Sequence, residues 1–229
     1  MHSDQVQSDQ VQSDQVLPDQ VLPDQRGDWW PELGPSGRVW VFAGDSITHG
    51  VVHTGTSRDY VELFAEQVRW ARFGEVMVTT GYSGWRITDL AAHLDYAVLR
   101  HRPEVVSLMF GTNDCAEDSG SSPEQFAADY RRQLDQITAA GAPRLILQTP
   151  PGVTPAASGG RAAALPAFVD QVRRIADERG LLLVDHFAHW QAAGDDAEPW
   201  YADPFHPNAA GHAEMARLLC ETLHAPGRG

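Results

Sequence analysis

The sequence predicts an α/β protein: a three-layer α/β/α sandwich around a flavodoxin-like, parallel, five-stranded sheet. From Arg38 onward, five short apolar runs alternate with longer amphipathic stretches. The runs are almost continuously apolar, which is typical of parallel strands buried on both faces. A strand followed by a helix, five times over, favours crossover connections and therefore a parallel sheet.

The expected strands are residues 38–43, 75–80, 105–110, 144–148 and 181–185. Each is followed by apolar residues three or four positions apart, which is the spacing of one helical face. The five predicted helical faces consist of Val61, Phe64, Ala65 and Val68; Leu90, Leu94, Ala97 and Val98; Phe126, Tyr130, Leu134 and Ile137; Phe168, Val172, Ile175 and Ala176; and Met215, Leu218, Leu219 and Leu223.

Residues 3–25 form a pentad repeat with a valine at every fifth position. A period of five fits neither the 3.6-residue turn of a helix nor the alternation of a strand, so no regular element could bury these valines together. We therefore expect a disordered tail over residues 1–27 and a single domain over residues 28–229.

The composition bounds the possible partners. The formal net charge of −14 and the pI near 5.0 argue against nucleic acid or an anionic membrane as a partner. No apolar stretch is long enough to span a membrane. The N-terminal repeat lacks the basic start and apolar core of a secretory signal, so the sequence predicts a cytoplasmic protein.

Four short polar blocks follow predicted strands or precede a helix. The first is Gly44-Asp45-Ser46, where an apolar run stops at a turn and presents a serine in fixed register, as an attacking hydroxyl requires. The usual Gly-x-Ser-x-Gly elbow is absent. The other three blocks are Gly81-Tyr82-Ser83-Gly84, Gly111-Thr112-Asn113-Asp114 and Asp203-Pro204-Phe205-His206-Pro207.

These blocks, in this order, resemble those of the SGNH hydrolases, also called GDSL esterases and lipases, over roughly Val39 to Leu223. The resemblance implies Ser46 as nucleophile, His206 as base and Asp203 as its orienting acid. It also implies Gly84, or less favourably Gly81, and Asn113 as oxyanion donors, and a strand order of 2-1-3-4-5. The chain departs from the pattern at Thr79, where the second block often begins with asparagine.

The chemistry of these residue types agrees with those roles. A neutral serine hydroxyl needs a base within hydrogen-bond reach, and imidazole has the ordinary pKa closest to neutral pH. A carboxylate three residues before His206 can hold its far ring nitrogen and stabilise the imidazolium that forms during attack. The backbone N–H groups of Ser46 and Gly84 and the amide of Asn113 can donate to a developing oxyanion.

The substrate is expected to be a small-molecule or carbohydrate ester with a short, acetyl-like acyl group. Aromatic and polar residues beside the four blocks are the candidates for its binding site: Asp45, Tyr82, Trp85, Arg86, Phe110 and Phe205. His53, like Arg86, could bind a carboxylate, a phosphate or sugar hydroxyls. Neither a cofactor nor a metal is expected.

Other functions remain open at this point. An acyltransferase or a thioesterase would use the same three residues. A metal-dependent hydrolase could be built from Asp185, His186, His189, Asp203 and His206, although they form no compact ligand motif. A non-catalytic carbohydrate-binding relative would have no reason to keep Ser46, Asp203 and His206 together.

Overall fold

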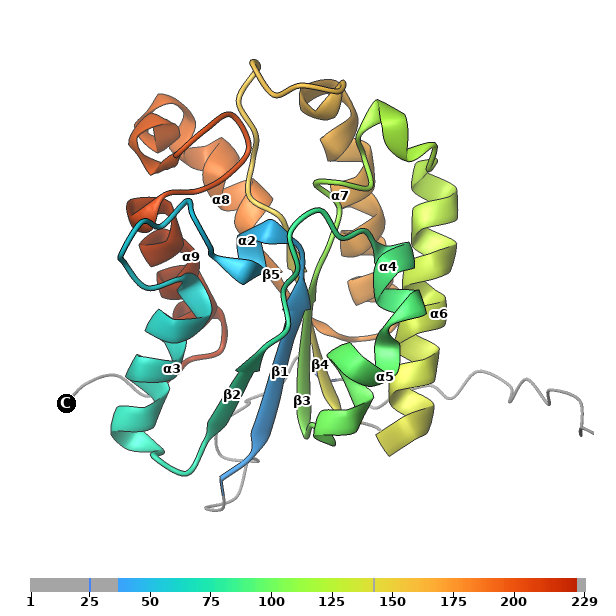
Figure 1. Cartoon of the computed structure of the whole chain (residues 1–229), viewed down its shortest axis with the longest axis vertical. Helices are drawn as coiled ribbons and strands as arrows, with labels where there is room; N and C mark the ends of the chain where they lie inside the picture. Colours follow the sequence, from blue (N-terminus) through green and yellow to red (C-terminus); the bar gives the residue numbers. More distant parts are fainter. Residues whose placement is uncertain (1–24, 26–36, 142, 226–229) are drawn as a thin grey trace, which may run out of the picture.

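The computed structural model describes Gln25 and residues 37–141 and 143–225. Its centre is a parallel sheet of five strands in the order β2-β1-β3-β4-β5 (Figure 1). The strands are β1 (Val39–Gly44), β2 (Val76–Thr79), β3 (Val105–Met109), β4 (Arg144–Thr149) and β5 (Leu182–Asp185). The predicted fold class and strand order are confirmed.

Helices cover both faces of this sheet (Figure 1). One face carries α3 (Tyr60–Ala71) and α9 (Ala209–Thr222), which pack on each other, and the other carries α4 (Ile87–Ala92), α5 (Leu94–Ala97), α6 (Pro123–Gly141) and α7 (Arg161–Glu178). The shorter elements are α2 (Ser46–His49), α8 (His186–Ala193), and the 3-10 turns η1 (Leu99–His101), η2 (Glu117–Ser119) and η3 (Gly194–Trp200).

The alternation of side chains along β1 shows how the two cores form. Trp40 and Phe42 are fully buried in the core beneath α3 and α9, whereas Val41 and Ala43 enter the core beneath α4 to α7. Successive side chains of a strand point to opposite faces, so a continuous apolar run fills both cores at once.

Two helical segments differ from the sequence-based expectation. The face predicted from Leu90 to Val98 is divided between α4 and α5, because His93 leaves helical geometry with φ −126°. The helix α8 was not expected, since its His-Phe-Ala-His-Trp start has no periodic polar face.

Gln25, which lies within the tail expected over residues 1–27, contacts the folded domain. Its side chain is buried, its N–H donates to the carbonyl of Gly180 (2.7 Å), and its Oε1 accepts from the N–H of Leu145 (2.7 Å). Leu145 lies one residue before the pairing of β4 with β5 begins at Ile146, so Gln25 supplies a partner that the ladder lacks there. Residues 1–24, which carry the rest of the predicted tail, lie outside the described part.

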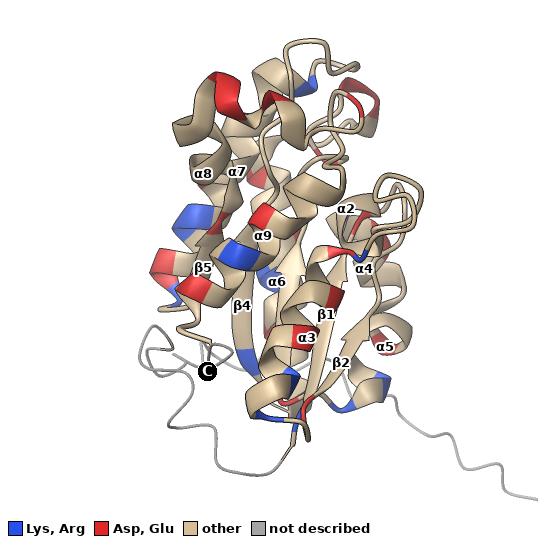
Figure 2. Ribbon diagram, turned by 90° about the vertical axis from the view of Figure 1, so that its left-hand side faces the viewer, with Lys and Arg blue, Asp and Glu red and all other residues tan. Residues whose placement is uncertain are grey.

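Acidic and basic side chains are mixed along α9 on the face shown in Figure 2. Arg217 donates to Glu214 (2.9 Å) and to Glu221 (2.6 Å), both on the same helix. No helix among the described residues is long and apolar enough to cross a bilayer.

Candidate active site

The candidate site lies at the carboxyl edge of the sheet, where three neighbouring strands end. Ser46 follows β1 as the first residue of α2, Gly84 follows β2, and Asn113 follows β3. The loop that carries Asp203 and His206 leads into α9. Loops at this edge, beside the point where the strand order reverses, are the usual ligand site of such sheets.

Ser46, His206 and Asp203 form an unbroken chain of hydrogen bonds. Ser46 Oγ lies 2.9 Å from Nε2 of His206, and Nδ1 of the same ring lies 2.7 Å from Oδ2 of Asp203. Ser46 is only 8% exposed, and His206 is half-buried. The sequence predicted all three residues, and the structure brings them together from segments 160 positions apart.

The Asp203 carboxylate also holds its own loop. Its Oδ1 accepts hydrogen bonds from the backbone N–H groups of Phe205 and His206, both at 2.9 Å. The loop is attached to the segment after β4 by a bond from Thr154 N–H to the carbonyl of Pro204 (2.8 Å). One oxygen of Asp203 therefore fixes the backbone while the other orients the imidazole.

The electrostatics of this chain suit a base that is neutral at rest. Burial lowers the pKa of His206, the hydrogen bond to Asp203 opposes that effect, and the positive charge that His53 carries when protonated lowers the pKa further; the net direction is down. Burial raises the pKa of Asp203, but hydrogen bonds from Phe205 and His206 outweigh it, so the net direction is also down. His206 is then neutral and Asp203 charged at neutral pH.

Gly84 sits in a tight turn that requires glycine. Its φ is +84°. The turn closes with a hydrogen bond from Trp85 N–H to the carbonyl of Tyr82 (3.1 Å), and the N–H of Gly84 does not take part in that bond. Gly81 has a different reason to be glycine: a Cβ there would lie 2.4 Å from the backbone nitrogen of His49. Gly81 thus permits close packing on α2, and Gly84 is the better candidate donor.

Asn113 and Asp114 attach the third block to the second. Asn113 Nδ2 donates to the carbonyl of Trp85 (3.1 Å), which leaves the second hydrogen of the amide for another acceptor. Asp114 is buried, and its Oδ1 accepts from the N–H of Ile87 (2.9 Å) at the start of α4. These two bonds fix the turn that carries Gly84 relative to the Asn113 amide.

Two residues expected at the substrate site lie in the interior instead. Asp45 is 1% exposed and caps α2 by accepting from Ile47 N–H (2.9 Å), and burial raises its pKa to about 7. Phe110 is fully buried in the core beneath α4 to α7. Both stand beside functional residues in sequence, but their side chains serve the fold, so we do not assign them to substrate.

The other four candidates lie at the rim. Tyr82 is 58% exposed and stacks on Trp85 (ring centroids 5.1 Å apart), while Phe205 is half-buried beside His206. Arg86 precedes α4, and its Nη2 lies 3.6 Å from Asp118 Oδ1.

Sequence reasoning missed the role of Arg161. Its Nε donates to the carbonyl of Thr112 (3.0 Å), directly before Asn113, and its guanidinium lies 5.2 Å from the ring centroid of Phe205. Arg161 thereby links the segment after β3 to the loop of Asp203 and His206. It follows a glycine-rich loop and matches no motif, so the sequence carried no signal for it.

The metal-binding alternative is not assembled. Asp185 is bound by Arg173 (2.8 Å), His186 is fully buried against Gln148 (2.8 Å), and His189 pairs with Glu214 (3.1 Å). Among the described residues, none of the first three joins Asp203 and His206 in a cluster of metal-ligating groups.

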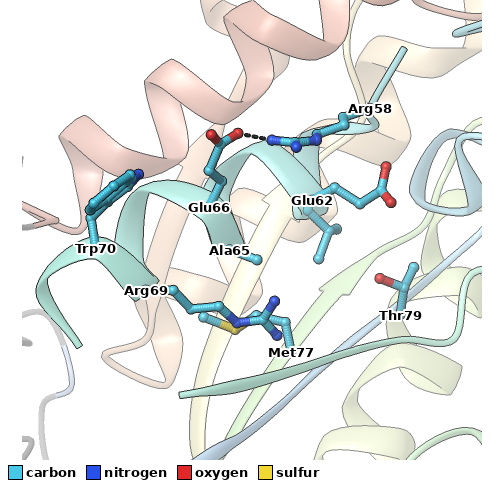
Figure 3. A pocket seen from close by; sticks show the side chains of 9 residues that line it. Arg58, Glu62, Ala65, Glu66, Arg69, Trp70, Met77 and Thr79 are labelled. Carbon is cyan, nitrogen blue, oxygen red and sulfur yellow. Dashed lines mark hydrogen bonds and ion pairs between the residues drawn. The ribbon is translucent and has the colours of Figure 1, made fainter. Parts of the chain in front are cut away.

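The grooves formed by the described residues include two that lie outside the serine site. A groove of about 720 Å³ runs between α3 and the edge strand β2, where Arg58 pairs with Glu66 and Arg69 extends toward Met77 (Figure 3). A groove of about 470 Å³ is lined by the segment after β4 together with Trp190 and Tyr201. Neither lining contains a serine with a base in reach, so the chemistry places the candidate site at Ser46.

Residues 42–214 match the model of the GDSL-like lipase/acylhydrolase family. The chain belongs to this family. A curated relative, the acetylxylan esterase of Geobacillus stearothermophilus, is 30% identical over 215 residues, covering 82% of this chain and 94% of the relative.

Solved structures agree with the fold of this SGNH hydrolase. The acetylxylan esterase structure from the same organism superposes with a TM-score of 0.69 at 23% identity, over 82% of this chain and 94% of that one. An α/β hydrolase from the metagenome of Lake Arreo, Spain, superposes with a TM-score of 0.72 at 25% identity, over 87% and 99%. The chain is an SGNH ester hydrolase.

Proposed function

We propose that this SGNH hydrolase removes short acyl groups, acetyl above all, from carbohydrate esters through an acyl-enzyme on Ser46. The observation that carries the proposal is the hydrogen-bonded chain from Ser46 through His206 to Asp203, at 2.9 and 2.7 Å, beside Gly84 and Asn113. Nucleophile, base and orienting acid stand in the relation that acyl transfer to serine needs.

In the first half of the reaction, Ser46 Oγ bonds to the ester carbonyl carbon while its proton passes to Nε2 of His206. The tetrahedral intermediate then collapses, the bond to the alcohol oxygen breaks, and the alcohol leaves with the proton from His206. In the second half, water attacks the carbonyl carbon of the acyl-enzyme and gives a proton to His206. The second tetrahedral intermediate then collapses, the bond to Ser46 Oγ breaks, and His206 returns the proton to Ser46 as the acid leaves.

The oxyanion of both intermediates needs donors that are already aimed. We assign this role to the N–H groups of Ser46 and Gly84 and to the free amide hydrogen of Asn113. Ser46 is the first residue of α2, where backbone N–H groups have no partner within the helix. Each such donor commonly contributes about 3 to 4 kcal/mol of transition-state stabilisation.

The acetyl preference rests on two kinds of support. The curated relative is named for acetylxylan, an acetylated carbohydrate. The rim around Ser46 offers exposed Tyr82 and the guanidinium of Arg86, which suit a polar, ring-bearing alcohol better than a long acyl chain. The cytoplasmic location stays a prediction of the sequence.

The mechanism is tested with Ser46→Ala and His206→Ala assayed on p-nitrophenyl acetate. Each variant should lose several orders of magnitude in kcat, and the double variant should lose little more, because the residues act as a unit. Circular dichroism serves as the control for folding. A single variant that keeps more than about a tenth of wild-type turnover would contradict the assignment.

The substrate is tested with p-nitrophenyl esters of increasing acyl length, run beside acetylated xylo-oligosaccharides and an acyl thioester. We expect kcat/KM to be highest from acetyl to butyryl, to fall steeply by octanoyl, and to be high on the acetylated sugars. Highest activity at decanoyl or beyond would indicate a lipase. A strong preference for the thioester would indicate a thioesterase with the same three residues.

A further inference from the structure

A second histidine lies flat on the proposed catalytic one. The ring centroids of His53 and His206 are 3.6 Å apart and the planes differ by only 8°. His53 Nδ1 also lies 3.5 Å from Oδ2 of Asp203, the oxygen that holds the His206 ring. That distance is too long for a hydrogen bond, so stacking is the main contact that His53 makes here.

The backbone that presents His53 is strained. Val52 has a φ of +76°, which a β-branched residue rarely adopts, and its side chain is 78% exposed, so packing does not explain the conformation. The loop is closed by bonds from Thr54 Oγ1 to the carbonyl of Gly50 (2.9 Å) and from Gly55 N–H to the carbonyl of Val52 (3.2 Å). Strain of this kind persists where the surroundings fix it, and it concentrates at functional sites.

A metal site is the first alternative, because one ligand atom each of His53, Asp203 and His206 lies within 4.8 Å of the others. The stacked geometry opposes it. An ion bound by an imidazole nitrogen lies in the plane of that ring. Two stacked rings that are nearly parallel, with centroids 3.6 Å apart, have planes that share no point near the rings. One ion could engage both histidines only after a ring turns out of the stack.

We infer that His53 is a positioning residue for the reaction: as a neutral imidazole it keeps the His206 ring between Ser46 and Asp203 and stabilises the imidazolium formed during attack. The inference rests on the proposed role of His206 as base. A ring held on one face cannot turn away from its two hydrogen-bond partners. The π face of a neutral aromatic ring also attracts the positive charge that His206 gains when it takes the proton of Ser46.

Protonation of His53 reverses this effect. A charged His53 repels the imidazolium and competes for the same oxygen of Asp203. The titratable groups that face His53 are Asp203 and His206 from the loop before α9 and His212 from α9 itself. His212 adds no charge at neutral pH, because burial lowers its pKa to about 4. The contact therefore requires an uncharged ring at position 53, and phenylalanine there keeps the ring uncharged at every pH.

The test compares His53→Ala, which removes the ring, with His53→Phe, which keeps a flat ring that cannot be charged. On a short ester, His53→Ala should lower kcat roughly 3- to 30-fold with KM nearly unchanged, the range expected for loss of one cation–π contact. His53→Phe should keep kcat within about threefold of wild type.

The matched control is His101→Ala, in η1 before β3 at the opposite edge of the sheet, which should leave kcat and the pH profile unchanged. His53→Ala with wild-type kcat, or His53→Phe with a loss of kcat as large as that of His53→Ala, would overturn the inference. If His53→Ala does not fold, the kcat of His53→Phe still decides. Activity that survives His206→Ala would instead contradict the proposed function.

Discussion

The side-chain amide of Asn113 has two N–H donors, and one of them is bound within the protein. One hydrogen is held by the carbonyl of Trp85 at 3.1 Å, which fixes the orientation of the amide, and we propose that the other donates to the substrate. A donor held in this way needs no reorganisation when charge develops on the carbonyl oxygen. Its contribution should therefore appear in the chemical step.

We expect Asn113→Ala to lower kcat roughly a hundredfold or more, with little change in KM. Steady-state kinetics on p-nitrophenyl acetate measure both parameters. Asn113→Asp is a useful companion, because it keeps the size but replaces the donor with an acceptor, and it should be at least as inactive. A rise in KM at constant kcat would place Asn113 in substrate recognition.

At the scale of single residues, motifs indicated some members of the candidate site and gave no sign of others. Ser46, Asp203 and His206 belong to short blocks whose chemistry is evident from adjacent residues. His53 is a single histidine in a loop, and only the fold brings its ring onto His206. Asp45 and Phe110 were assigned to substrate because they adjoin such blocks, but the backbone turns their side chains into the interior.

At the scale of elements, apolar runs predicted all five strands. The strands β1, β3 and β4 are buried almost throughout, whereas the edge strand β2 is partly exposed. Helices were less predictable where apolar spacing did not mark one clear face. His93 interrupts the face from Leu90 to Val98, and α8 buries Phe187 and Trp190 without a periodic pattern. Gln25 was assigned to the tail because nothing in its repeat distinguishes it from its counterparts.

The contact between Gln25 and β4 can be tested directly. Gln25→Ala leaves the N–H of Leu145 without its acceptor, and an unpaired buried donor costs about 1 to 3 kcal/mol. The thermal midpoint should fall by roughly 2 to 12 °C in a chain of this size. Gln20→Ala, at the same position one repeat earlier, is the control and should leave the midpoint unchanged. Equal midpoints for both variants would show that the Gln25 contact adds no stability.

At the scale of the whole molecule, buried acids and buried histidines oppose each other as the pH changes. Burial raises the pKa of Asp45 and of Asp114 to about 7. Their stabilising contribution is complete below the unfolded pKa of about 4 and is lost as the pH rises through 7. Burial lowers the pKa of His186 to about 3 and of His212 to about 4, so their contribution is lost as the pH falls from about 6.5.

We therefore expect the free energy of unfolding to vary little between about pH 4.5 and 6.5. In this range the two acids bind protons only in the folded state and the two histidines only in the unfolded state, so the two effects cancel. Replacing both acids, Asp45→Asn with Asp114→Asn, leaves the histidines unopposed, so stability should then rise with pH. His212→Asn should give the opposite slope. Urea unfolding at several pH values measures this. A double variant as pH-independent as the wild type would show that the two acids are ionised in the folded protein.

Because β1 lies between β2 and β3, the spacing of these strands determines how far apart the loops that follow them begin. Neighbouring parallel strands are about 4.8 Å apart, and Ser46, Gly84 and Asn113 follow three neighbouring strands. This spacing is set by backbone hydrogen bonds between the strands, so a substitution of one side chain does not change it. Side chains at the rim, such as Tyr82 and Arg86, are free of that constraint. We therefore expect substitutions there to change which ester is accepted while the spacing of the reacting groups stays the same.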